Sequence, residues 1–267
     1  MRITTWNVNG LRAAIDKGFG AHLDAIAPDI LLLQEVRARP HQLQPGWAHP
    51  DGWHALWHPS GTPGYSGVAV WSRVATGPSG REQATPEILE TGLGAADPEG
   101  RVLRVRVGWL QVASVYLPSG SSGPERQAVK ETFMAELLEW SRALAALDEP
   151  VILGGDLNIA PTPDDLFNPT GNKRNSGFLP QEREWFAALL ASGWTDLFRA
   201  HRGPGKGPWS WWSNRGKARE LDRGWRIDFL LGNAAAAARL KSAAIRKEAG
   251  ITVSDHAPVT VDLRRHA

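Results

Sequence analysis

The sequence contains no cysteine, which excludes a disulfide framework and a thiolate zinc site. Any metal ion must therefore be held by oxygen ligands or histidine, and carboxylate and amide oxygens favour Mg²⁺ or Mn²⁺. Long apolar runs are also missing, since none approaches the roughly 20 residues that a membrane-spanning helix needs. The amino terminus enters an alternating strand pattern at residues 2–6 without an apolar signal region. We therefore expect a cytoplasmic protein that does not bind a membrane.

An excess of charge of one sign is missing as well, because the formal net charge is only +2. The overall balance is thus a weak indicator of a polyanionic partner. Local clustering is more informative: residues 215–226 include five basic side chains, Arg215, Lys217, Arg219, Arg223 and Arg226, against Glu220 and Asp222. Thirteen tryptophans are many for 267 residues. Most should pack in the core, and one or two could stack on bases.

The segment Val151-Ile152-Leu153-Gly154-Gly155-Asp156-Leu157-Asn158 is typical of a buried strand that ends in two polar residues. Side chains alternate along an extended chain, so Asp156 and Asn158 should point the same way while Leu157 points into the core. Taken alone, Gly-Asp-x-Asn is as typical of a turn as of a catalytic site. Other parts of the chain must decide between these interpretations.

Several other expected strands also end in polar residues. The first strand runs into Asn7, the apolar run at 30–33 is followed by Glu35, and a strand ending near 117 carries Tyr116. Asp228 lies on a strand expected at 225–231, and Asp255-His256 should lie in the loop before a last strand at 259–263. Each residue alone has an ordinary surface or turn interpretation.

The remaining patterns predict mixed strands and helices in one domain, because no Pro/Gly/Ser-rich linker separates two cores. Antiparallel pairs are expected at 53–57 with 67–71 and at 101–107 with 109–117. The longest helix should begin at Pro124 and bury a stripe of residues: Val129, Phe133, Leu137, Trp140, Leu144 and Leu147. Further helices are expected at 180–191 and 234–240. The irregular segment 161–177 is long enough to be either functional or disordered, and another polar loop is expected at 201–224.

Six short motifs, which follow one another along the chain, contain these strand-end residues. They are Trp6-Asn7-Val8-Asn9-Gly10-Leu11-Arg12, Leu33-Gln34-Glu35, Tyr116-Leu117-Pro118, Gly155-Asp156-Leu157-Asn158, Gly224-Trp225-Arg226-Ile227-Asp228 and Ser254-Asp255-His256-Ala257-Pro258. Together they resemble the endonuclease/exonuclease/phosphatase superfamily, specifically its exonuclease III branch of abasic-site endonucleases. The resemblance implies an α/β fold for residues 1–267: a DNase I-like four-layer sandwich with two facing, largely antiparallel sheets flanked by helices.

The resemblance also implies an activity, a cofactor and a partner. The expected reaction is cleavage of the phosphodiester 5′ to an abasic site in duplex DNA, together with 3′ to 5′ exonuclease and 3′ phosphodiesterase activity. The expected cofactor is one Mg²⁺ ion, for which Mn²⁺ can substitute. The expected partner is double-stranded DNA, abasic or with damaged 3′ ends, bound by a monomer associated with the nucleoid. A phosphatase for a small or lipid phosphate and a non-catalytic nucleic-acid-binding relative stay open as alternatives.

Residue roles follow from the same resemblance. The implied metal ligands are Asn7, Glu35 and Asp255, with Asp156 and Asn158 as further candidates. The implied catalytic residues are Tyr116, Asp156, Asn158, Asp228 and His256. Asp156 would orient and deprotonate the attacking water. A carboxylate favours a neighbouring imidazolium, so His256 paired with Asp228 would stay protonated and donate to a phosphate oxygen.

Substrate contacts are implied for two further groups. Asn172, Lys173, Arg174, Arg215, Lys217 and Arg223 would hold the DNA, with the basic members neutralising phosphates. Trp211, Trp225 and Ile227 would wall a small apolar pocket for an extruded abasic sugar. The sequence departs from the family pattern at two positions. Asn9 stands where some relatives have Asp, which weakens a second metal site, and Ser119 stands where many have Asn, which shortens a phosphate contact.

Overall fold

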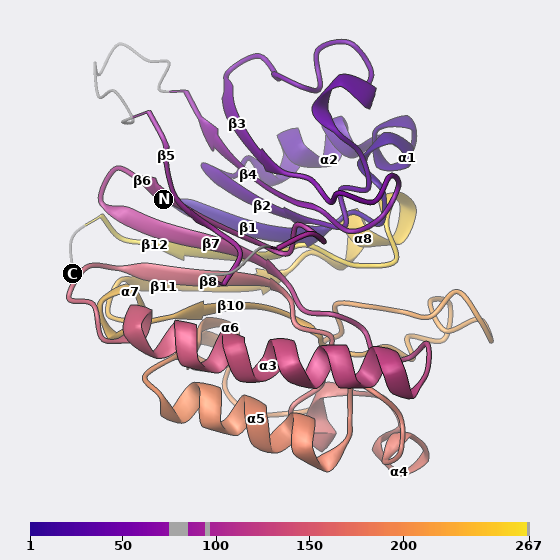
Figure 1. The fold of residues 1–267 in the computed structure, drawn as a ribbon. Coiled ribbons are helices and arrows are strands. Elements are labelled where there is room, and N and C mark those ends of the chain that lie inside the picture. The colour runs from indigo at the N-terminus through magenta and orange to yellow at the C-terminus, as the bar shows by residue number, and fades with distance from the viewer. Residues whose placement is uncertain (75–84, 94–96, 266–267) are drawn as a thin grey trace.

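The computed structural model describes residues 1–74, 85–93 and 97–265, and in this part of the chain two six-stranded sheets face each other. Helices cover the outer face of each sheet, so the molecule has four layers (Figure 1). The expected four-layer α/β sandwich is therefore confirmed. No helix within the described ranges is long and apolar enough to span a bilayer.

The first sheet has the strand order β11-β12-β1-β2-β4-β3. Its strands are β1 (Arg2–Asn7), β2 (Ile30–Gln34), β3 (Trp53–His58), β4 (Val68–Arg73), β11 (Leu240–Ile245) and β12 (Val259–Leu263). Only β1 and β2 pair in parallel here, with Asn7 opposite Gln34. Because parallel strands end at the same edge, Asn7 and Glu35 leave the sheet side by side.

The second sheet has the strand order β5-β6-β7-β8-β10-β9. Its strands are β5 (Glu87–Thr91), β6 (Val102–Val107), β7 (Leu110–Tyr116), β8 (Val151–Asp156), β9 (Thr195–Asp196) and β10 (Asp228–Gly232). Parallel β7 and β8 place Tyr116 opposite Asp156, and antiparallel β10 places Asp228 opposite Asp156 from the other side. Three polar residues from three strands thus form one row at the edge of this sheet.

Helices fill the outer layers and form the crossovers that parallel strands require. The first sheet is covered by α1 (Leu11–Asp16), α2 (Phe19–Ile26) and α8 (Lys247–Val253), and the second by α3 (Pro124–Ala145) and α5 (Pro180–Ala191). The shorter helices are α4 (Pro169–Asn172), α6 (Leu197–Arg202), α7 (Ala234–Ala237), η1 (Pro40–Gln42) and η2 (Pro163–Asp165). Proline suits the first position of α3 and α5, because the N–H it lacks would find no partner in the helix there.

An aliphatic core lies between the sheets, and at one position close packing requires a glycine. A Cβ added at Gly154 would lie 2.6 Å from the methyl carbons of Leu32, in the first sheet, and Leu230, in the second. A buried polar chain also crosses the gap: Gln34 Nε2 donates to Ser114 Oγ at 2.9 Å, and Ser114 Oγ donates to the Leu33 carbonyl at 3.0 Å. The two sheet edges are therefore fixed relative to each other near Glu35 and Asp156.

Most predicted elements are confirmed, including the antiparallel pairs β3–β4 and β6–β7 and the helix that begins at Pro124. The stripe predicted on that helix is wrong at Val129, whose residue surface is 44% exposed. The neighbouring Lys130 is fully buried instead, because its ammonium pairs with Glu182 at 2.6 Å. α3 therefore carries buried charge as well as apolar packing.

Two predicted boundaries near the carboxyl terminus are also wrong. The strand expected from Trp225 begins at Asp228, because Trp225 forms isolated bridges with Trp211 and Leu166 instead of continuing the ladder. The helix expected at 234–240 ends at Ala237, because Leu240 already pairs with Leu263 in the neighbouring strand β12. The expected loop at 161–177 contains η2 and α4.

Candidate active site

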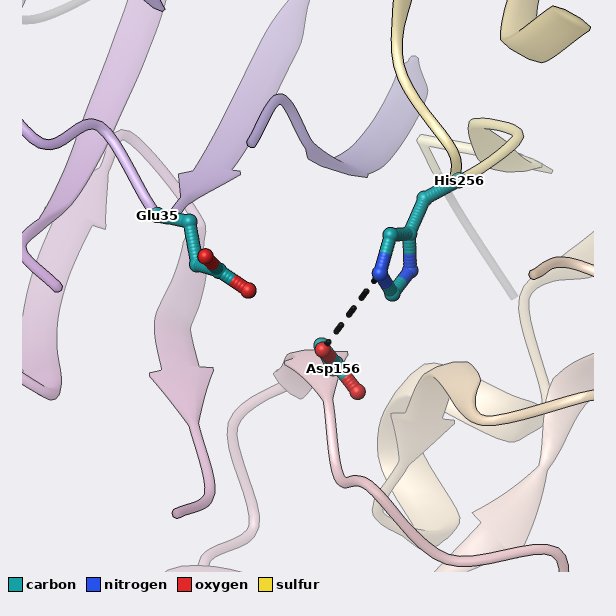
Figure 2. Close-up of side chains that lie close together, drawn as sticks. All are labelled: Glu35, Asp156 and His256. Atoms are coloured by element: carbon teal, nitrogen blue, oxygen red, sulfur yellow. Dashed lines mark ion pairs between the residues drawn. The ribbon is translucent and has the colours of Figure 1, made fainter. Parts of the chain in front are cut away.

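The candidate site lies where the ends of β1, β2, β7 and β8 meet the beginnings of β10 and β12. Glu35, Asp156 and His256 form one group whose ligand atoms all lie within 4.8 Å of one another. Figure 2 shows these three side chains converging on the same space from separate elements. The pairing of the strands thus brings together residues that lie more than 200 positions apart in the sequence.

Glu35 is held in the site by an unusual backbone conformation. Its φ is +49°, in the left-handed region that a glutamate seldom adopts. Its carbonyl accepts the Gly10 amide at 2.8 Å, which stabilises the turn. One carboxylate oxygen accepts hydrogen bonds from Asn7 Nδ2 at 2.9 Å and from the Tyr116 hydroxyl at 2.8 Å, and the other pairs with Arg37. The Glu35 carboxylate is therefore fixed from three sides.

Asp156 is almost completely buried at the end of β8, with 1% of its surface exposed. One of its oxygens accepts the Asn158 amide at 2.8 Å, and the other accepts Asn7 Nδ2 at 2.9 Å. Burial raises the pKa of Asp156 to about 7, with the neighbouring carboxylates of Asp228 and Glu35 adding to the rise and His256 opposing it. Such a carboxylate suits a general base at neutral pH.

His256 is buried between two carboxylates. Its Nδ1 lies 2.9 Å from Asp228 Oδ2, and its Nε2 lies 3.9 Å from Asp156 Oδ2. Burial alone would lower the pKa of His256, but the charges of Asp228 and Asp156 outweigh it and raise that pKa to about 10. The side chain is therefore an imidazolium that can donate from Nε2 towards the Asp156 side of the site.

The backbone around His256 is held by Ser254 and Trp6. Ser254 Oγ accepts the His256 amide at 3.1 Å and donates to the Asn7 carbonyl at 2.7 Å. The Trp6 indole donates to the His256 carbonyl at 3.0 Å. These contacts join the loop before β12 to the end of β1, so the imidazole is oriented by the first sheet while it faces the second.

Tyr116 lies beneath Glu35 with its hydroxyl buried. Burial raises the pKa of Tyr116 well above its ordinary value, and the charges of Glu35 and Asp156 raise it further. The Tyr116 hydroxyl is therefore a proton donor at neutral pH. The Arg101 guanidinium lies 4.6 Å from the centre of the tyrosine ring and donates to the Tyr116 carbonyl at 2.9 Å.

Asp255, an expected metal ligand, faces a different set of partners. Its oxygens accept Asn9 Nδ2 at 2.7 Å and the Trp211 indole at 3.1 Å. Although burial acts against it, the charge of His256 and these hydrogen bonds lower the pKa of Asp255. The carboxylate lines the same cavity as Glu35 but lies outside the group formed by Glu35, Asp156 and His256.

The donor chemistry fits a hard cation. The carboxylates of Glu35 and Asp156 lie close together, and the side-chain amide nitrogen of Asn7 donates a hydrogen bond to each of them. The Asn7 oxygen accepts the Asn9 amide at 3.0 Å. Two carboxylates held together in a buried site repel each other, and a cation would relieve that repulsion. The site can therefore hold a metal ion with oxygen ligands.

A cavity of about 740 Å³ opens above this group. Residues expected in the site that line it are Glu35, Tyr116, Asp156, Asn158, Trp211, Trp225, Ile227, Asp255 and His256, together with Asn9, Ser119, Asn172, Arg174 and Arg215. Asn7 and Asp228 lie behind this lining and contact it through hydrogen bonds. Lys173, Lys217 and Arg223 are exposed and do not line it.

One wall of the cavity is apolar. Trp211 and Trp225 lie with ring centres 6.3 Å apart, and Ile227 packs in the same small cluster. An isolated bridge joins the backbones of Trp211 and His256, and their ring centres lie 6.4 Å apart, so this wall is next to the imidazolium. Trp225 is only partly buried and is not part of the large cores between the layers.

Some contributors to the site were not predicted. Arg37 pairs with Glu35, and Ser176 and Gly177 line the cavity. Lys130 donates to the Asn158 carbonyl at 2.9 Å from inside α3, and its partner Glu182 accepts the Gly177 amide at 2.7 Å. Local pattern gives no signal for these residues, although the spacing of Arg37 two residues after Glu35 could have drawn attention to it.

Known proteins are similar to this chain over nearly its whole length. The endonuclease/exonuclease/phosphatase family model matches residues 4–256. An exodeoxyribonuclease of Bacillus subtilis is 36% identical over 266 residues, covering 97% of this chain and 98% of that protein. A 3′ phosphatase from Neisseria, solved bound to a product DNA hairpin, has a TM-score of 0.85 at 32% identity and 99% coverage of both chains. An AP endonuclease from Archaeoglobus fulgidus has a TM-score of 0.84 at 25% identity, covering 98% of this chain and 99% of that one.

Proposed function

Because the chain belongs to the endonuclease/exonuclease/phosphatase family, we propose that it is a DNA-repair hydrolase that cleaves the phosphodiester 5′ to an abasic site in duplex DNA. The 3′ to 5′ exonuclease and 3′ phosphodiesterase activities belong to the same proposal, since an exodeoxyribonuclease and a 3′ phosphatase are among its relatives. Residues 1–267 would form one catalytic domain that acts as a monomer on DNA in the cytoplasm.

The observation that carries this proposal is the group of Glu35, Asp156 and His256 at the floor of a cavity with an apolar wall. A phosphodiester needs a base for the attacking water and positive charge for the developing phosphorane. Asp156 supplies the base and His256 supplies a donor 3.9 Å away from it. An anion entering the cavity would thus meet both groups at once.

Each residue of the group has a distinct proposed role. Asp156 accepts a proton from the attacking water, and Asn158, whose amide nitrogen lies 3.3 Å from Asp156 Oδ2, holds the carboxylate in place. His256, oriented by Asp228, donates to a phosphate oxygen. Tyr116 keeps its proton and donates a hydrogen bond, which orients Glu35 before the substrate enters.

Glu35 is the proposed principal ligand of Mg²⁺, for which Mn²⁺ can substitute, with Asn7, Asp156, Asn158 and Asp255 as further candidates. When bound, Mg²⁺ would polarise a phosphoryl oxygen and stabilise charge on the leaving 3′ oxygen. Asn9 donates to Asp255, and an amide in place of a carboxylate favours one metal ion over two.

Selectivity for abasic DNA is proposed to come from the apolar wall. Trp211, Trp225 and Ile227 leave room for a bare sugar, and extrusion costs less where no base pair must be broken. Asn172, Arg174 and Arg215 reach the cavity rim. Lys173, Lys217 and Arg223 would contact the duplex outside the cavity.

The test is a panel of substrates with purified protein and Mg²⁺. The panel contains matched duplexes that carry an abasic site, a recessed 3′ end, a 3′ phosphate or no damage, together with an inositol phosphate. We expect incision at the abasic site at a rate about 10²-fold or more above that on undamaged duplex, because a few kcal/mol of unpairing cost correspond to a factor of about that size. Phosphate release from inositol phosphate without DNA cleavage would show a small-molecule phosphatase instead. Duplex binding without any hydrolysis would show a non-catalytic relative.

A further inference from the structure

An exposed phenyl ring lies beside the apolar wall of the cavity. Phe167 is 41% exposed, although it is one of the larger apolar side chains of the chain. Its amide donates to the Gly224 carbonyl at 2.9 Å, and the preceding Leu166 bridges to Trp225. The ring is therefore fastened to the same segment that supplies the cavity wall.

Two cations lie against this ring. Lys206 Nζ is 5.4 Å and the Arg223 guanidinium carbon is 5.3 Å from its centre. Within the described part of the chain, neither cation forms an ion pair, whereas nearby Lys217 and Lys247 pair with Glu220 and Asp222. Lys206 Nζ also donates to the Phe167 carbonyl at 3.0 Å, so the ring and two positive charges without a carboxylate partner among the described residues form one exposed surface.

This surface is joined to the wall of the candidate active site through Leu166, which directly precedes Phe167 and bridges to the cavity-lining Trp225. Phe167 directly precedes the segment that carries Asn172 and Arg174, and Arg223 follows the segment that carries Arg215. All three rim residues line the cavity. Nucleotides repeat about every 3.4 Å along the helix axis, so duplex DNA extends beyond the cavity and the strand next to the cleaved nucleotide needs contacts outside it.

We infer that Phe167, Lys206 and Arg223 form a platform for the DNA strand next to the cleaved nucleotide, an inference that rests on the proposed function. Extrusion of a nucleotide leaves the face of its neighbour without a stacking partner. An aromatic ring can stack on that face irrespective of sequence, and the flanking cations can contact the adjacent phosphates. The platform therefore binds an unstacked base and its backbone outside the pocket for the damaged sugar.

A structural role for the same contacts would be to join the segments around 167 and 223. That role needs an apolar or cation–π contact but does not need the ring to be exposed. The two roles differ in one measurable respect. A structural contact affects all substrates alike, whereas the platform acts only on DNA long enough to reach it.

The test measures binding of duplexes that carry a central abasic-site analogue, by fluorescence anisotropy in an Asp156→Asn background that slows cleavage. Phe167→Leu should weaken binding about 5- to 10-fold, at the lower end of the loss seen when a stacking aromatic is removed, and Phe167→Tyr should keep wild-type affinity. Lys206→Gln and Arg223→Gln should each reduce the slope of log Kd against log salt concentration by about one. Lys241→Gln, at an exposed position on β11, is the matched control and should leave the slope unchanged.

A second arm shortens the duplex stepwise from each side of the abasic site. The Phe167→Leu penalty should vanish at one end once the strand no longer reaches the platform. An equal penalty at every length, or a lowered melting temperature with it, would show a structural contact and overturn the platform. Unchanged affinity of Phe167→Leu for DNA that the parent protein binds would also overturn it. A parent protein that binds no duplex at all would instead refute the proposed function itself.

Discussion

At the residue scale, the proposed reaction depends on a carboxylate whose charged form is destabilised by burial. Asp156 is buried among other acids, and His256 and the Asn7 and Asn158 amides counter its charge. Such a group is costly for folding and useful for catalysis, because a base with a pKa near 7 both accepts a proton and returns it at neutral pH. The burial that makes the Asp156 charge costly for folding is therefore the property that suits it to the proposed reaction.

We predict that Asp156→Asn lowers kcat by about 10²- to 10⁴-fold, the usual contribution of a general base. The amide keeps the size of the side chain, so the affinity for abasic duplex should stay within about twofold of the wild-type value. A change of that size is smaller than the effect of losing a typical contact between two residues. Removal of the buried charge should also leave the melting temperature equal or higher. Single-turnover cleavage, anisotropy and thermal unfolding check these points. A variant that cleaves at the wild-type rate would exclude Asp156 as the base.

Single residues also show what the sequence could and could not reveal. The strand-end positions of Glu35, Tyr116 and Asp156 were predictable, because a polar residue after an apolar run marks the end of a buried strand. In contrast, it was not predictable that Lys130, and not Val129, lies on the buried face of α3. A lysine is buried only where a partner meets it, and Glu182 lies 52 residues further along the chain.

At the element scale, short segments escaped prediction because their pairing is set by distant strands. β11 pairs with β12, and β9 contributes only Thr195 and Asp196, so neither shows enough periodicity on its own. Trp225 alternates with Ile227 as a strand would, yet bridges to Trp211 and Leu166 override this pattern. The long helices α3 and α5 were predictable, since Pro at the first position of both and Gly193 after the end of α5 are local signals.

The segment that carries Trp225 and Asp228 is anchored by a buried ionic network. Arg226 donates to Asp165 and Asp196, both at 2.7 Å, and Arg199 reaches Asp165 from α6. Burial would raise the pKa of Asp165, but Arg226 and the hydrogen bonds outweigh it and lower that pKa below its ordinary value of 3.8. Its contribution to stability is therefore fully present above about pH 4, the unfolded-state pKa, and is lost as the pH falls through the lower folded-state pKa.

We predict that Asp165→Asn destabilises the protein by about 3 kcal/mol at pH 7, because it leaves Arg226 buried with one carboxylate fewer. Below about pH 4 the difference from wild type should begin to shrink, since Asp165 takes up a proton first in the unfolded chain and, at lower pH, in the folded protein. Urea unfolding at pH 7, 5 and 3.5 measures both effects. Glu139→Gln removes an exposed partner of Arg142 and serves as the control, with an expected change within about 0.5 kcal/mol. A difference that stayed constant across this pH range would contradict the assignment of the stability to the Asp165 charge.

At the scale of the whole molecule, the candidate site exists only because two sheets meet. Glu35 follows a strand of the first sheet, while Tyr116 and Asp156 end strands of the second. Hydrogen bonds from Asn7 to Asp156 and from Tyr116 to Glu35 cross between them. The distance between the sheets thus determines the geometry of the site. Sequence pattern alone does not predict this distance, because it depends on packing at Gly154 and on polar contacts between distant strands.

The buried contact between Gln34 and Ser114 provides the test of this dependence. Ser114→Ala leaves the Gln34 amide without its acceptor, which should cost about 1–3 kcal/mol of stability. It also frees the end of β2 next to Glu35, so we predict a fall in kcat of about tenfold, since displacements below 1 Å can have such effects on a reaction. Ser141→Ala is the control, because Ser141 Oγ is equally buried but donates only within α3, to the Leu138 carbonyl at 3.0 Å. It should lower stability without changing kcat. Equal kcat in both variants, measured at a temperature where both are folded, would show that the inter-sheet contact stabilises the fold without setting the geometry of the site.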